Sequence, residues 1–143
     1  MRDISKIGVN VRDEFPYPEG RVLAIVETID QLRDTVKALV DARFLASEIE
    51  IVHGATAADK LAEGTGRGGF ANIAMRLASK VGLPNDEMAL RRRYEEAMRN
   101  GQFVVAVTTP TNDRKVLASQ VIHDHGGTFI HYFGQRTFEV MSV

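Results

Sequence analysis

Two stretches of the chain are apolar at every position, and a helical pattern and a second, more mixed stretch follow each of them. The resulting elements are expected in two matching strand–helix–strand passages, over 22–27, 29–44 and 48–53, then over 103–108, 113–125 and 128–133. Unbroken apolar runs are typical of strands buried on both faces. We therefore expect the first and third strands in the centre of a sheet, with the second and fourth at its edges.

The order of these elements also predicts how they are arranged. Right-handed crossovers put both connecting helices on the same face of a sheet. Two interleaved units with the first and third strands central form the ferredoxin-like arrangement. The sequence thus predicts an α+β fold, a ferredoxin-like βαβ…βαβ sandwich with a helical insert between the second and third strands.

The insert, about residues 54–101, is expected to hold three helices. Their predicted ranges are 55–63, 70–81 with an amphipathic stripe, and 86–99 with Leu90, Tyr94, Ala97 and Met98 facing inward. Residues 1–20 show no sustained period and include glycines and prolines, so an irregular or extended arm is predicted there. Residues 21–143 are then a single domain.

One face of this sheet lacks a cover in the prediction. Alternate residues of a strand point in opposite directions, and in 22–26 both sets are apolar. The two crossover helices cover one face, so the insert, the C-terminal segment or a second copy must cover the other. We expect a homodimer, with 137–141 as a further strand that extends an edge or crosses to the second subunit.

Composition limits the chemistry that is available. The 143 residues include no cysteine, which excludes disulfides, thiolate metal sites and cysteine nucleophiles. A formal net charge of -1 is not the basic balance of a protein that binds mainly nucleic acid. No apolar run approaches the roughly 20 residues of a membrane span, and no apolar signal stretch opens the sequence. A cytoplasmic protein without membrane contact is expected.

A glycine-rich segment is the first candidate for ligand binding. Gly64, Gly66, Arg67, Gly68 and Gly69 match the dinucleotide fingerprint and precede a predicted helix, whose N-terminus can hold a phosphate. That fingerprint directly follows a strand, whereas ten residues separate His53 from Gly64. We therefore favour a flexible loop, with anion or nucleotide binding at these five residues as the alternative.

The only basic cluster is Arg91, Arg92 and Arg93 on the third insert helix. Three consecutive residues fan over about 200° of a helix, so a solvated, ion-paired helix is favoured over a surface for nucleic acid. The four histidines give no common metal site, because His123 and His125 point apart on their helix. No catalytic residue, metal site or cofactor is predicted.

Several segments carry a resemblance to a known family. They are 22–26 with the helix that follows, Phe44 and 48–52, then 93–97, 101–107, 125–127 and 131–134. With these segments the chain resembles the small bacterial general-stress proteins of the heat-induced YflT type. The resemblance spans about residues 21–138 and implies a stress-associated, non-enzymatic cytoplasmic protein.

We therefore predict a binding or assembly module, which forms a homodimer and takes a protein partner. Two alternatives remain open: a small-ligand or nucleotide sensor that uses the glycine-rich loop, and a nucleic-acid-associated protein that uses the arginine helix.

Overall fold

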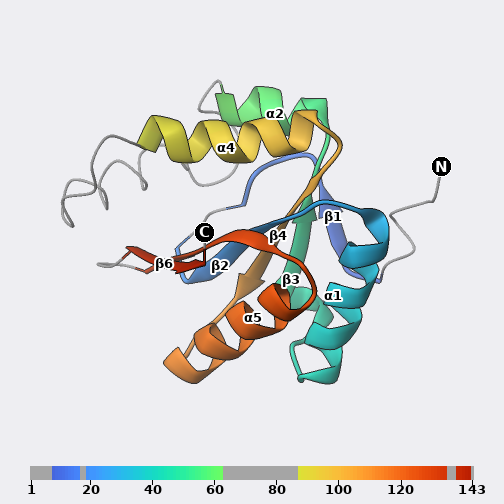
Figure 1. Ribbon diagram of the computed structural model, residues 1–143, viewed down its shortest axis with the longest axis vertical. Coiled ribbons are helices and arrows are strands. Elements are labelled where there is room, and N and C mark those ends of the chain that lie inside the picture. Colours follow the sequence, from blue (N-terminus) through green and yellow to red (C-terminus); the bar gives the residue numbers. More distant parts are fainter. Residues whose placement is uncertain (1–7, 17–18, 63–86, 135–137, 143) are drawn as a thin grey trace.

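The chain forms a six-stranded sheet with helices on both faces, which confirms the predicted α+β class (Figure 1). The structure is a computed structural model, and it describes residues 8–16, 19–62, 87–134 and 138–142. The helices of the described chain are α1 (Ile29–Asp41), α2 (Ala55–Ala62), α4 (Glu87–Arg99) and α5 (Asn112–Asp124), with a short 3₁₀ turn at Ala46–Glu48.

The strands lie in the order β1–β3–β4–β2–β5–β6. Their bounds are β1 (Asn10–Arg12), β2 (Arg21–Val26), β3 (Ile49–Val52), β4 (Phe103–Thr108), β5 (Thr128–Phe133) and β6 (Phe138–Ser142). Strand β1 is parallel to β3, and every other neighbouring pair is antiparallel. Strands β2 and β4 are central and pair along six residues each, as their continuous apolar runs predict.

Helices α1 and α5 cover one face of the sheet. The two helices begin in the same way, because the side chain of Thr28 accepts a hydrogen bond from the Gln31 N–H and that of Thr111 accepts one from the Arg114 N–H. Their apolar sides pack on the even-numbered residues of β2, which are fully buried. The buried residues of this layer include Val22, Ala24, Val26, Leu32, Leu39, Val105, Ala118 and Ile122.

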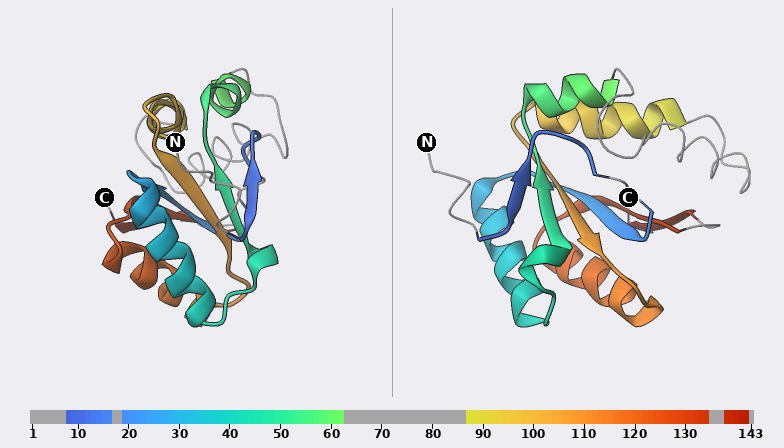
Figure 2. Two further views of the ribbon diagram at one scale, coloured as in Figure 1. Left: turned by 90° about the vertical axis from the view of Figure 1, so that its right-hand side faces the viewer. Right: turned by 180° about the vertical axis from the view of Figure 1, so that it is seen from behind.

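Helices α2 and α4 lie side by side over the opposite face (Figure 2). Leu23 and Ile25 of β2 and Val104 of β4 form the floor of this second layer. The residues that the two helices bury against it are Ala57, Ala58, Leu61, Tyr94, Ala97 and Met98, with Leu90 partly buried beside them. Of the three expected covers for this face, the insert is therefore the one that the structure uses. The expected helix over 70–81 lies outside the described residues.

One expectation about the edges of the sheet was wrong. Strands β3 and β5 are not edges, because β1 pairs with β3 and because β6, the strand expected near 137–141 as an extension of an edge, pairs with β5. The N-terminal stretch, predicted as an irregular or extended arm, contains β1 and also supplies Phe15, which is 1% exposed in the layer under α4. A three-residue strand with the sequence Asn-Val-Arg has too few apolar positions for a period-2 pattern.

The first helix is shorter than its apolar period predicts. It ends at Asp41, and Arg43 then takes a positive φ of 73°. The Phe44 N–H donates to the Leu39 carbonyl, and the Phe44 side chain turns into the core with 2% exposure. This left-handed closure satisfies the last carbonyls of the helix. At the end of α5, Gly126 has a φ of 90°, the left-handed conformation that glycine adopts readily after a helix.

Replacing Tyr94 tests whether α4 is part of the folded core. Tyr94 is completely buried, so Tyr94→Ala should lower the free energy of unfolding by about 3–5 kcal/mol, the usual loss when a large aromatic is deleted from a core. Denaturant unfolding measures this loss. The control Glu96→Ala, at an exposed position of the same helix, should stay within about 0.5 kcal/mol of the wild type. A loss below about 1 kcal/mol for Tyr94→Ala would contradict the packing described above.

Candidate functional site

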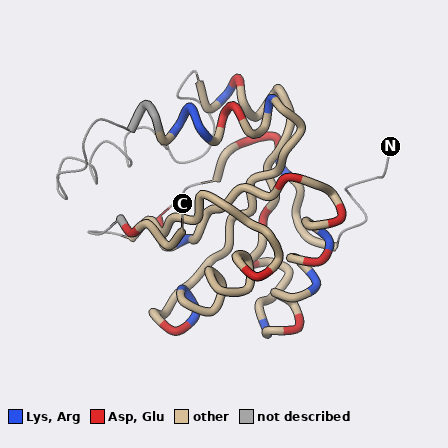
Figure 3. Tube along the Cα trace, in the orientation of Figure 1, with Lys and Arg blue, Asp and Glu red and all other residues tan. Residues whose placement is uncertain are grey.

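The structure describes one of the two groups of candidate residues that the sequence indicates. Gly64, Gly66, Arg67, Gly68 and Gly69 lie outside the described residues. Arg91, Arg92 and Arg93 lie on α4, where they form a continuous basic stretch among otherwise interspersed charges (Figure 3).

The three arginines differ in their surroundings. Arg91 is half-buried, and Arg92 and Arg93 are exposed, with the Arg93 guanidinium 5.4 Å from the centre of the Phe129 ring. Further along the helix, Arg99 pairs with Asp59 of α2 at 2.7 Å and with Glu95, one turn earlier on α4, at 3.2 Å. The arginine run is thus divided between solvent and packing.

The histidines are also separate from one another. His123 is exposed, and His125 is hydrogen-bonded through Nδ1 to the Val121 carbonyl at 2.8 Å. His53 packs on the Phe103 ring with 5.4 Å between ring centres, three strands away from His131. Within the described ranges, no three His, Asp or Glu side chains converge as metal ligands do.

His131 and Tyr94 form a buried polar pair under α4. The His131 Nδ1 lies 3.0 Å from the Phe129 carbonyl and 3.5 Å from the Tyr94 hydroxyl. A carbonyl can only accept, so Nδ1 carries the proton and donates it to Phe129. Burial lowers the pKa of His131, and the hydrogen bond to Phe129 opposes this to a smaller extent. Burial likewise raises the pKa of Tyr94 well above its ordinary value, and the positive charge of Arg93 lowers this pKa to a smaller extent.

Phe129 reaches this pair because of an irregularity in β5. The register between β2 and β5 shifts between Leu23 and Ile25, and Phe129 takes a φ of 54° there. Its ring then packs edge-on against Tyr94 at 5.1 Å and lies 4.3 Å from the His131 ring. A left-handed conformation costs a residue other than glycine about 1–3 kcal/mol, and bulges re-aim side chains. Sequence period alone gives no signal for such a position.

A buried carboxylate lies on the same face of the sheet, at β3. The side chain of Glu50 is 8% exposed and pairs with Arg21 of β2 at 3.2 Å and with Arg12 of β1 at 3.8 Å. Two cations, one from the adjacent β1 and one from β2 on the far side of β4, thus compensate one carboxylate that burial has removed from water. The pair with Arg12 helps to hold β1 on the sheet, although the apolar pattern does not predict this strand.

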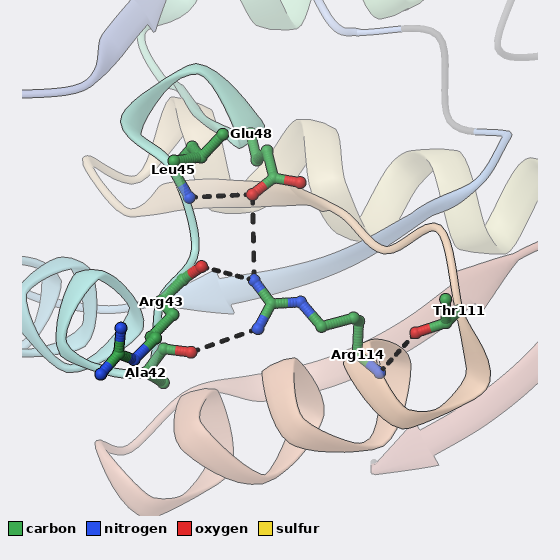
Figure 4. A network of polar contacts seen from close by, with 6 residues as sticks. All are labelled: Ala42, Arg43, Leu45, Glu48, Thr111 and Arg114. Atoms are coloured by element: carbon green, nitrogen blue, oxygen red, sulfur yellow. Dashed lines mark hydrogen bonds and ion pairs between the residues drawn. The ribbon is translucent and has the colours of Figure 1, made fainter.

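In the layer on the other face of the sheet, Arg114 links the two helices α1 and α5 (Figure 4). Its guanidinium donates to the Ala42 carbonyl at 3.2 Å and to the Arg43 carbonyl at 2.7 Å. It also lies 3.7 Å from the centre of the Phe44 ring and 3.9 Å from a Glu48 oxygen. Planar donors of this kind suit the unsatisfied carbonyls at a helix end, so Arg114 links the first turn of α5 to the end of α1.

The outer strand β6 combines a paired charge with an exposed apolar side chain. Its charged residue, Glu139, forms an ion pair at 2.7 Å with Lys115 of α5, whose ammonium also lies 4.9 Å from the centre of the Tyr132 ring. Val140 is 53% exposed. Between α5 and β6 lies a shallow hollow of about 310 Å³, lined by Val116, Ser119, Gln120, His123, Met141 and Ser142. The sequence predicts this strand, but it does not predict that Lys115 neutralises the charge of Glu139.

Comparisons of the chain with protein-family models, with curated proteins and with solved structures gave no match. The described elements form a mixed α+β domain in which β1 and β6 are the outer strands of the sheet. No described helix has the length and apolar character that a membrane crossing requires.

The buried His131 predicts how stability depends on pH. The pKa of His131 is lower in the folded than in the unfolded chain. Its contribution to the free energy of unfolding is therefore fully present above the ordinary pKa of about 6.5. This contribution is lost as the pH falls from about 6.5 through the lowered pKa of the folded chain, because His131 takes up its proton at a higher pH in the unfolded chain. Burial also lowers the pKa of His53, which adds to the same trend.

Denaturant unfolding of the wild type, His131→Gln and His123→Gln between about pH 8 and pH 5 measures this dependence. We expect His131→Gln to flatten the loss of stability at acidic pH, while the exposed control His123→Gln keeps the slope of the wild type. Equal slopes in all three proteins would show that His131 is not buried in its neutral form.

Proposed function

We propose that this chain is a non-enzymatic binding or assembly module that takes a protein partner along strand β6. The observation that carries the proposal is the state of this outer strand, whose Glu139 is neutralised by Lys115 while Val140 stays exposed. An outer strand presents backbone N–H and C=O groups along its open side, and pairing with another strand satisfies them.

The two outer strands of the described sheet differ in how far they resist such pairing. Natural edges are usually protected by short length, by charge or by bulges. The charged side chain of each outer strand is paired within the chain, Arg12 with Glu50 and Glu139 with Lys115. The strands differ in length, because β1 has three residues and β6 has five. Strand addition is therefore favoured at β6.

Apolar side chains near β6 support the same proposal. Val140 projects on the side of the sheet that α4 covers, because it pairs in register with His131. On the other side, Val116 of α5 is 51% exposed and lines the hollow next to Met141. An added strand would bury apolar surface on both sides of the sheet, which strengthens backbone pairing.

The proposal also includes a bacterial stress response as the biological setting and a ferredoxin-like fold. The resemblance to YflT-type general-stress proteins supports a cytoplasmic role in a bacterial stress response. The antiparallel order β3–β4–β2–β5, with α1 and α5 as the two crossovers, supports a ferredoxin-like unit into which α2 and α4 are inserted.

Native mass spectrometry of the chain isolated from its own cells tests the proposal. We expect an assembly heavier than the 15.8 kDa monomer in the wild type, and we expect Val140→Lys to abolish it, because a charge on an outer strand opposes pairing. The matched control is Val40→Lys, at a similarly exposed valine on α1. Monomer alone in all three samples, or an assembly that survives Val140→Lys, would contradict the proposal.

A further inference from the structure

We infer that the partner at β6 is a second copy of this chain, paired antiparallel with the first about a two-fold axis at Val140. The inference rests on the proposed function above and names the occupant of that surface. It also gives the pairing a register, which can be tested residue by residue.

The charge pattern of β6 favours a strand like itself. Glu139 is compensated by Lys115 at 2.7 Å, so β6 offers no unpaired charge that selects an oppositely charged partner. In antiparallel pairing about Val140, each Glu139 lies opposite Met141 of the second copy, and the two carboxylates do not face each other. Pairing about Glu139 would instead place two carboxylates opposite each other, which is destabilising.

The same register brings apolar groups together. The two Val140 side chains, each half-exposed in the single chain, become a directly opposed cross-strand pair. The two α5 helices flank the new junction on the other side of the sheet, where the exposed Val116 and the hollow of about 310 Å³ give room for side chains of the incoming strand. One patch that complements itself is what a two-fold interface requires.

A single introduced cysteine measures this register, because the natural chain has none. Directly opposed residues of antiparallel strands have Cα atoms about 4.5–5.5 Å apart, within the range that a disulfide spans. Val140→Cys should therefore cross-link two chains under mild oxidation. Ser142→Cys places its sulfur atoms about 14 Å apart along the strands in this register and should not cross-link.

The rate of dimer formation is followed on non-reducing gels at micromolar protein, with Val40→Cys as the control for random collision. We expect Val140→Cys to react at least tenfold faster than both Ser142→Cys and Val40→Cys. Sedimentation of the cysteine-free wild type should show a dimer that Val140→Lys converts to a monomer, while thermal unfolding checks that each variant is folded.

The outcomes separate this inference from the proposed function. If Val140→Cys reacts no faster than Val40→Cys, while an assembly with a different protein is still lost in Val140→Lys, the second copy is excluded and binding at β6 stands. If the native sample holds no assembly that depends on Val140, both fail. Fast cross-linking through Ser142→Cys in place of Val140→Cys would overturn the register.

Discussion

The apolar character of both faces of β2 and β4 is the constraint on which the rest of this structure depends. Every residue of 22–26 and of 104–107 is essentially inaccessible to solvent, so a single layer of helices cannot satisfy this sheet. Helices α1 and α5 are the natural cover of one face, since they connect strands within the sheet. The other face makes α2 and α4 necessary parts of the core, and Tyr94 is the largest side chain that they bury there.

Polar groups within the two layers serve to fix their arrangement. Glu50 with Arg12 and Arg21 ties three strands together, and Arg114 ties the end of α1 to the start of α5. His131 is held in one tautomer by the Phe129 carbonyl. Buried polar groups are stable only when they are paired, so each of these contacts restricts the alternative packings of a largely aliphatic core.

Much of this fold could be predicted from the chain. Continuous apolar runs gave the central strands β2 and β4, and a period of 3.6 residues gave α1, α2, α4 and α5 within a few positions of their observed ends. The failures have local causes. Strand β1 is too short for a pattern, and the end of α1 depends on the left-handed Arg43. An amphipathic stripe shows that a helix packs on something, but it does not show on what, so the cover of the second face stayed open between the insert, the C-terminal segment and a second copy.

The candidate site was less predictable than the fold. A strand near 137–141 follows from its composition, but the neutralisation of its Glu139 depends on Lys115, which is 24 positions away. Contacts of that kind arise from the tertiary structure and leave no spacing in the sequence. The same holds for the position of Phe129 between Arg93 and His131, since a bulge with a positive φ places it there.

Native-state hydrogen exchange in increasing denaturant tests most directly the central claim that α4 belongs to the core of one two-sided sheet. The account predicts that the amides of residues 94–99 and those of β2 and β4 exchange through the same opening, with free energies that converge on the global value. Exchange of α4 at a much lower free energy, while β2 and β4 stay protected, would contradict it. The sheet would then hold one of its faces without the insert.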